Sequence, residues 1–293
     1  MFAPADFQLR RSVLYVPGSS ERALAKAAGL RCDAVILDLE DAVAPAEKIA
    51  ARDRVCAAVV AARYAPREVA IRVNTLSTPW HEDDIRAAAA ARPDAVLAPK
   101  INTMADVDTI ERELDAAGAG QEVQIWAMLE TPLAILNAAE IAGSSKRLSV
   151  LVVGVNDLAK ELHAQDVPGR APLLLALSTA VLAARSAGKA VLDGVFDNIT
   201  DTRGFEDDCL QSRQLGFDGK TLIHPSQVEP CNRVFTPSAE EVERAQRTIA
   251  AFDQAITRGE GVATLDGRLI ENLHVESARR ILAMSQEIDR RKP

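Results

Sequence analysis

Two stretches, EVQIWAMLET (residues 122–131) and LSVLVVGVND (residues 148–157), show most clearly how this chain folds. Each is a short, almost unbroken apolar run that ends in an acidic residue, Glu130 in the first and Asp157 in the second. Unbroken apolar runs are typical of strands in a parallel sheet that is buried on both faces. The two stretches therefore predict parallel strands with carboxylates at their carboxyl ends.

The same alternation of a short apolar run with a longer, Ala- and charge-rich segment of helical spacing repeats along the chain. Ser20 is the expected N-cap of the first intervening helix. Eight such units favour a closed α/β fold, the (β/α)8 TIM barrel, over an open doubly wound sheet, and no GxGxxG motif follows the first strand to support the open sheet. The predicted strands cover residues 12–16, 34–39, 68–73, 94–99, 122–129, 148–153, 189–195 and 218–223.

The chain continues past the eighth unit. A helix is predicted from Ser238, with Glu241 at capping-box spacing, and a glycine-rich connector leads to a last helix around residues 275–287. We therefore expect a barrel domain over residues 1–235 and a C-terminal helical extension over residues 236–293. The extension is a candidate lid and subunit-contact arm, and packing against the outside of the barrel is an equally good interpretation.

Composition and charge exclude several classes of protein. The formal charge of −8 is spread over 293 residues without a basic run, which argues against a nucleic-acid partner. The apolar runs are too short to span a bilayer, and the N-terminus lacks the apolar core of a secretory signal. The four cysteines show no CxxC spacing. We expect a cytoplasmic protein with reduced thiols and no membrane partner.

Polar side chains follow the predicted strands at their carboxyl ends, which is where barrel enzymes hold their reacting groups. Any one of these side chains could simply cap a helix. Glu130 and Asp157, however, follow neighbouring strands and would face one mouth of the barrel. Two carboxylates completed by waters and substrate oxygens suit Mg²⁺, so we predict that this pair holds the metal.

Other residues at the same mouth are candidates for substrate binding. Arg72 can grip a carboxylate of the substrate through two parallel hydrogen bonds, and the alternative for it is an internal salt bridge to Asp38 or Glu40. Glu40 and Asp41 could orient metal-bound waters. Lys100 could add positive charge to the mouth or serve as a structural ion-pair partner. The four histidines show no HExxH spacing and no GxSxG motif occurs, so zinc and serine hydrolases are disfavoured.

Several segments, in order and almost end to end, resemble the citrate lyase β-subunit-like family within the HpcH/HpaI aldolase superfamily. They are RRSVLYVPG, DAVILDLEDAVAP, IRVN, PKI, MLET, GVNDLAKEL, GFDGKTLIHPSQ and GRLIENLHVESARRIL. The resemblance implies a TIM barrel, commonly assembled into homotrimers or hexamers. It also implies Mg²⁺ held by Glu130 and Asp157, substrate carboxylate bound by Arg72, and Glu40 and Asp41 beside the metal-bound waters.

The resemblance further implies carbon–carbon cleavage of a β-hydroxyacyl-CoA, such as malyl-CoA, citramalyl-CoA or a citryl thioester, to an acetyl thioester and a 2-oxo acid. Related lyases place an aspartate of a neighbouring subunit's C-terminal lid over the site, and Glu271 stands at that position here, with Asp266 nearby. These two residues are the candidate proton carriers, and a surface acid is the alternative for Glu271. Candidates for binding coenzyme A, by position only, are Tyr15, Arg11, Lys26, Lys220 and His224.

Other functions stay open at this point. The chain could be the β subunit of citrate lyase acting on a carrier-protein thioester, with an acyl-carrier subunit as a less expected partner. It could hydrolyse malyl-CoA as a thioesterase, or be a class II-type aldolase for free hydroxy-oxo acids. A non-catalytic barrel would require the metal and substrate residues to be lost, and they are present.

Overall fold

A computed structural model describes residues 8–291 of the chain. The chain divides into two compact units, one spanning residues 10–235 and the other containing the C-terminal segment from Thr236 onward. Each unit has its own apolar core. In the described part of the chain, no helix combines the length and the apolar character that crossing a membrane requires.

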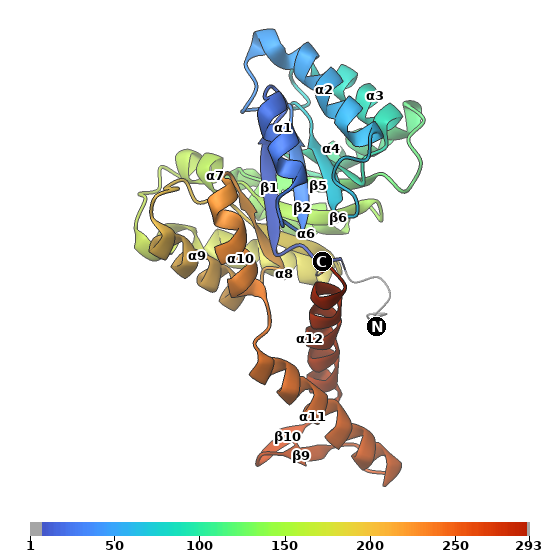
Figure 1. Cartoon of the computed structure of the whole chain (residues 1–293), viewed down its shortest axis with the longest axis vertical. Coiled ribbons are helices and arrows are strands. Elements are labelled where there is room, and N and C mark those ends of the chain that lie inside the picture. Colours follow the sequence, from blue (N-terminus) through green and yellow to red (C-terminus); the bar gives the residue numbers. More distant parts are fainter. Residues whose placement is uncertain (1–7, 292–293) are drawn as a thin grey trace. The chain divides into compact units, whose positions relative to one another are not determined.

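The first unit is a closed barrel of eight parallel strands, each hydrogen-bonded to its neighbours in chain order, with β1 also pairing with β8 (Figure 1). The predicted (β/α)8 TIM barrel is therefore confirmed, and every predicted strand overlaps an observed one. The strands are β1 Ser12–Pro17, β2 Ala34–Asp38, β3 Glu68–Arg72, β4 Ala95–Ala98, β5 Gln124–Leu129, β6 Leu148–Val153, β7 Ala190–Asp193 and β8 Gly219–Leu222.

Helices follow the strands on the outside of the barrel (Figure 1). The first begins at Ser20, whose side chain accepts a hydrogen bond from the backbone N–H of Ala23, as an N-cap does. The α-helices are α1 Glu21–Ala28, α2 Lys48–Val60, α3 His81–Ala91, α4 Met104–Ala116, α5 Pro132–Leu136, α6 Ala138–Gly143, α7 Val155–Glu161, α8 Leu174–Ser186, α9 Thr202–Leu215 and α10 Val228–Phe235. Short 3-10 helices are η2 Pro45–Glu47, η3 Pro168–Leu173 and η4 Pro225–Gln227.

The register of the strands decides which side chains reach the mouth of the barrel. A small inner core contains Ile36 of β2, Ala70 of β3 and Met128 of β5. Alternate residues of a strand share one face, so the residues two positions further on point the same way. Those residues are Asp38, Arg72 and Glu130, and the β2–β3 pairing places Asp38 directly beside Arg72. Charged side chains at the carboxyl ends of β2, β3 and β5 thus lie at the same mouth of the barrel.

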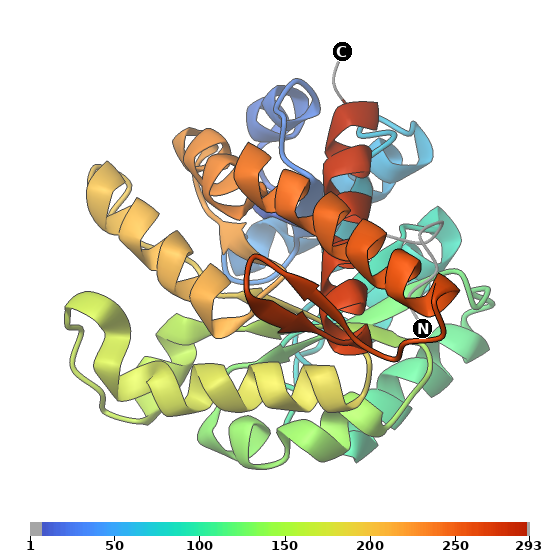
Figure 2. The ribbon, with the colours of Figure 1, turned by 90° about the horizontal axis from the view of Figure 1, so that it is seen from below.

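The second unit consists of α11 Ala239–Thr257, a hairpin of β9 Ala263–Leu265 and β10 Arg268–Ile270, and α12 Asn272–Arg290. The capping box of Ser238 and Glu241 is confirmed at the start of α11. The hairpin was not predicted, although its turn, Asp266-Gly267 with φ of 50° and 72°, is a sequence typical of a two-residue hairpin loop. Figure 2 shows the hairpin alongside α11, which contacts β9.

Candidate active site

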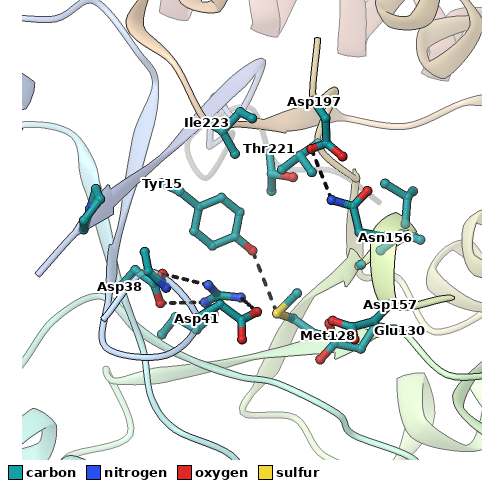
Figure 3. A pocket seen from close by; sticks show the side chains of 17 residues that line it. Tyr15, Asp38, Asp41, Met128, Glu130, Asn156, Asp157, Asp197, Thr221 and Ile223 are labelled. Carbon is teal, nitrogen blue, oxygen red and sulfur yellow. Dashed lines mark hydrogen bonds and ion pairs between the residues drawn. The ribbon is translucent and has the colours of Figure 1, made fainter. Parts of the chain in front are cut away.

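A cavity of about 390 Å³ opens at the carboxyl ends of the strands. Figure 3 shows its side chains converging from β1, β2, β5, β8, the first turn of α7 and the loop after β7. Its polar lining brings together the residues Asp38, Asp41, Arg72, Glu130, Asn156, Asp157, Asp197 and Thr221. The predicted metal pair and Arg72 therefore share one cavity at the expected end of the barrel.

Glu130 lies directly after β5 and is 2% exposed. Its Oε1 atom accepts a hydrogen bond of 2.7 Å from the backbone N–H of Lys100. Burial raises the pKa of the Glu130 carboxyl, and the Lys100 N–H opposes that effect. Gly154 makes room for the side chain, because a Cβ atom there would come within 2.5 Å of the Glu130 Oε2 and Cβ atoms. The glycine between β6 and α7 is thus part of what positions the glutamate.

Asp157 lies in the first turn of α7, and its Oδ1 atom is 3.2 Å from the ammonium of Lys100. Lys100 therefore contacts both acids of the pair, Glu130 through its backbone and Asp157 through its side chain. Its φ of 51° lies in the left-handed region, which is unusual for a residue with a side chain. The nearby carboxylates raise the pKa of Lys100 against the opposing effect of burial, Glu130 contributing most.

The donor chemistry of this pair fits Mg²⁺, which prefers carboxylate oxygens and retains several waters. Glu130 Oε2 accepts no hydrogen bond from any residue between 8 and 291 and is directed at the space beside Gly154. Within that same range, no group of three or more His, Cys, Asp or Glu side chains forms a complete metal site. Waters and substrate oxygens would therefore have to complete the coordination.

Arg72 is buried and forms the internal salt bridge that was the alternative interpretation of this residue. Its Nε and Nη2 atoms each donate at 2.7 Å to the two oxygens of Asp38, and Nη1 lies 2.9 Å from Glu40. The guanidinium also stacks over the ring of Tyr15, 4.8 Å from its centroid. Because Arg72 still lines the cavity, these contacts hold its planar group rigidly where an anionic ligand would meet it.

Glu40 and Asp41 flank the same guanidinium from the loop after β2. Glu40 is buried, and burial raises its pKa to about 7 although Arg72 opposes the effect. Asp41 is exposed, with Oδ2 3.6 Å from Arg72 Nη1. A carboxyl group with a pKa of about 7 can exchange its proton near neutral pH.

The structure separates the predicted residues for coenzyme A binding. Tyr15 lines the cavity and also a second one of about 270 Å³, which Lys26 of α1 and Arg22 border. His224 begins η4, where its Nδ1 atom is 2.7 Å from the Ser226 hydroxyl. Tyr15, Lys26 and His224 therefore remain candidates.

Two of the predictions for coenzyme A binding are wrong. Arg11 precedes β1, at the opposite end of the strand from the cavity, and is held by a bidentate pair with Asp33. Lys220 is 0% exposed, and its ammonium lies 2.9 Å from Asp193 and 2.5 Å from Asp208 of α9. A fully buried and neutralised lysine is not available to a phosphate, so neither residue stands at the barrel rim.

In the second unit, Asp266 occupies the hairpin turn and pairs with Arg247 of α11. Glu271 is the N-cap of α12, and its backbone N–H donates to His274 Nδ1 at 3.0 Å. Both acids are exposed. Their proposed role in proton transfer remains a prediction.

Three residues of the cavity were missed or left without a role by sequence reasoning. Met128 and Thr221 were hidden inside runs assigned to strand cores, and Asp197 received no role. The alternation of inward positions would have found Met128, since it lies two residues before Glu130. Nothing in the sequence marks the contact of Asp197 with Asn156, because it joins the loop after β7 to the first turn of α7.

Comparisons with known proteins show which family the chain resembles. The profile of the HpcH/HpaI aldolase/citrate lyase family matches residues 11–225. A (3S)-malyl-CoA thioesterase from Cereibacter sphaeroides is 48% identical over 95% of both chains. The citrate lyase subunit beta of Leuconostoc mesenteroides is 36% identical over 95% of this chain and 94% of its own. The solved structure of CitE from Mycobacterium tuberculosis, in complex with magnesium, acetoacetate and coenzyme A, is 27% identical, with a TM-score of 0.74 over 94% and 97% of the two chains.

Proposed function

We propose that this chain, which belongs to the HpcH/HpaI aldolase/citrate lyase family, is a thioesterase. It would hydrolyse a β-hydroxyacyl-CoA of the malyl-CoA type to the free acid and coenzyme A. The observation that carries the proposal is the single cavity in which Glu130 and Asp157 meet Arg72. Two acids for a divalent cation beside a fixed guanidinium form a site for a small hydroxy acid with a carboxylate.

Relatives favour hydrolysis over the carbon–carbon cleavage that the sequence resemblance placed first. The thioesterases from Cereibacter sphaeroides are 47–48% identical to this chain, whereas the citrate lyase β subunits reach 34–36%. Carbon–carbon cleavage remains the second candidate, because it is the lyase activity that the citrate lyase relatives are named for. The alternatives of a carrier-protein substrate and of free hydroxy-oxo acids rank below both.

Glu130 and Asp157 would hold Mg²⁺, which when bound acts as a Lewis acid and as a template for the hydroxyl and carboxylate of the substrate. Arg72 would bind the substrate carboxylate, and Asp38 would keep the guanidinium in plane for that contact. The buried Glu40, whose pKa is about 7, would orient water at the edge of the site together with Asp41. This division assigns the metal to one pair of acids and the orientation of water to another.

The second cavity supports a place for the coenzyme A arm. It shares Tyr15, Pro17 and Ile223 with the first, so a chain-like group could run from one into the other. Its walls are mostly apolar side chains of β1 and α1, while Arg22 and Lys26 offer positive charge at the border. We propose that the pantetheine part lies along the apolar wall and that Lys26 meets a phosphate.

We also propose that the protein assembles into a homotrimer or hexamer, as the family resemblance implies, and that it is cytoplasmic. Four free cysteines support a reducing environment. Within such an assembly Glu271, with Asp266 nearby, would serve a neighbouring subunit as a proton carrier. Sedimentation velocity measures the assembly, and a monomer at all concentrations would contradict it.

The proposed function is tested by offering malyl-CoA, citramalyl-CoA and citryl-CoA to the purified protein with Mg²⁺ and separating the products by chromatography. We expect free coenzyme A and the hydroxy acid, with malyl-CoA turned over fastest. Acetyl-CoA with glyoxylate, pyruvate or oxaloacetate would instead establish the carbon–carbon lyase. If no thioester is consumed, the proposal fails.

A further inference from the structure

We propose that Asp197 is the general base of thioester hydrolysis and that Asn156 holds it in position. The inference rests on the proposed function, since it assigns the residue that activates water in that reaction. It goes beyond the metal pair and Arg72, which would bind the acid end of the substrate, and beyond Glu40 and Asp41, which would orient water, because it names the residue that takes the proton from the hydrolytic water.

Asp197 lies in the loop after β7 and lines the same cavity as Glu130 and Asp157. Figure 3 shows its carboxylate beside Thr221, facing Asn156 across the cavity rim. The Asn156 side-chain amide donates a hydrogen bond of 3.1 Å to Asp197 Oδ1. Because Asn156 directly precedes Asp157, this hydrogen bond ties Asp197 to the first turn of α7, which carries the proposed metal acid.

The loop that carries Asp197 is anchored at two points just before that residue. At Gly194 the backbone passes so close to β6 and α7 that a Cβ atom would come within 2.7 Å of the Val153 carbonyl and the Val155 side chain. Two residues later, the Phe196 carbonyl accepts a hydrogen bond of 2.8 Å from Gln227. A carboxylate held by such a loop is preorganised, as a catalytic base must be.

The charges of the cavity single out Asp197. Asp38 and Asp41 lie against Arg72, and Glu130 and Asp157 contact the backbone and side chain of Lys100. Asp197 is the one acid of the cavity lining for which the described residues supply no basic partner, and its hydrogen bond comes from a neutral amide. A carboxylate whose partner is a neutral amide still has lone pairs that can accept a hydrogen bond from water.

The step balances without a further reagent. A water molecule gives a proton to the Asp197 carboxylate, and its oxygen forms a bond to the thioester carbonyl carbon. The carbon–sulfur bond then breaks, and the leaving thiolate takes the proton back from Asp197. One water and one thioester become one carboxylic acid and one thiol, and Asp197 is regenerated.

The test compares Asp197→Asn with the wild-type enzyme in Mg²⁺ and malyl-CoA. The variant should release coenzyme A at least about 100-fold more slowly than wild type, because general base catalysis typically contributes on the order of 10²–10⁴-fold. Its Mg²⁺ affinity, measured by calorimetry, should be unchanged. Asn156→Ala should lower the rate by a smaller factor. Asp207→Asn, an exposed acid of α9 outside the cavity, is the matched control and should behave as wild type.

Hydroxylamine distinguishes a base from a structural residue, because this strong nucleophile attacks thioesters without needing a base at neutral pH. After subtraction of the rate without enzyme, since hydroxylamine also cleaves free thioesters, it should restore release of coenzyme A by Asp197→Asn and yield the hydroxamate. If hydroxylamine does not restore the rate, or if Asp197→Asn hydrolyses like wild type, the role of Asp197 is overturned while the proposed function stands. If wild type itself releases no coenzyme A, the proposed function falls and this inference with it.

Discussion

At the scale of single residues, the site depends on how closely the backbone approaches Glu130. The carboxylate is buried against Gly154, and this close approach leaves no room for a methyl group at Gly154, between β6 and α7. Catalytic side chains that are fixed by packing rather than by long hydrogen-bond networks are sensitive to such contacts.

Gly154→Ala should therefore weaken Mg²⁺ binding by at least about 10-fold, since its Cβ atom would meet Glu130 Oε2 and Cβ at 2.5 Å and displace the side chain. Titration calorimetry measures the affinity. Gly143→Ala is the matched control, because a Cβ there meets nothing within 4 Å. Equal Mg²⁺ affinities of the two variants would show that Gly154 does not position Glu130.

Lys100 supplies a second prediction. Its ammonium lies 3.2 Å from Asp157, so it competes electrostatically with a cation bound there. Lys100→Met should bind Mg²⁺ about 3- to 10-fold more tightly, by the same calorimetric measurement, as one opposing charge is removed. Lys146→Met, at an exposed lysine before β6, should leave the affinity unchanged. Weaker binding by Lys100→Met would show that the lysine supports the metal site rather than competing for it.

Glu40 makes stability depend on pH. Its folded-state pKa of about 7 lies above the ordinary 4.5, so the folded protein holds this proton more tightly than the unfolded chain. The resulting stabilisation is complete below about pH 4.5 and disappears as the pH rises through about 7. In EDTA, wild type should lose about 1–3 kcal/mol of unfolding free energy over that range relative to Glu40→Gln, measured by denaturant titration. Glu161→Gln is the control, and its stability should depend on pH as that of wild type does. If the pH profile of Glu40→Gln also runs parallel to that of wild type, the role of Glu40 is contradicted.

The sequence predicted Glu130, Asp157 and Arg72 because each ends a recognisable strand. It failed for Arg11 and Lys220 for a common reason: strands of a parallel barrel are apolar on both faces, so the sequence does not show which way a residue points. Lys220 faces the helices, and Arg11 lies at the start of its strand. The register of the strands in the structure shows which way each of these side chains points, and the apolar runs do not.

At the scale of elements, one buried charge cluster joins β7, β8, α9 and η3. Asp193 accepts from Lys220 and Ser212 and pairs with Arg170, which also contacts Asp208. Burial alone would raise the pKa of Asp193, but Lys220 and Arg170 lower it to about 2. The cluster fixes the strand that leads into the Asp197 loop.

Asp193→Asn should destabilise the barrel by about 3–5 kcal/mol, because it leaves two buried cations with one carboxylate. Urea denaturation measures the loss. Glu206→Gln, which removes an exposed ion pair of α9 with Arg233, should cost less than about 1 kcal/mol. A similar small cost for both variants would mean that the buried cluster contributes little.

Elements were predicted more fully than their contacts. All eight strands follow from apolar runs, and two helix starts follow from their caps. The hairpin of β9 and β10 was missed because its strands have three residues each and half of their side chains are exposed, so no apolar run marks them. Its Asp-Gly turn was the available signal.

At the scale of the whole molecule, the chain combines a barrel that carries the cavity with a second unit of two helices and a hairpin. The barrel contains the proposed metal pair, the substrate arginine and the proposed base within one cavity. Barrel folds serve many reactions, so function here is argued from those side chains and the family rather than from the fold. Whether the site hydrolyses the thioester or cleaves a carbon–carbon bond depends on the positions of water and of the thioester. The pattern of strands in the sequence does not predict these positions.

The central claim is that Glu130 and Asp157 hold the metal on which turnover of the thioester depends. It is tested most directly by measuring Mg²⁺-dependent release of coenzyme A from (3S)-malyl-CoA by wild type, Glu130→Gln and Asp157→Asn. We expect wild-type release to stop in EDTA and return with Mg²⁺, and each variant to be slower by at least about 10³-fold at any Mg²⁺ concentration. Release that survives EDTA, or variants that keep the wild-type rate, would contradict the account.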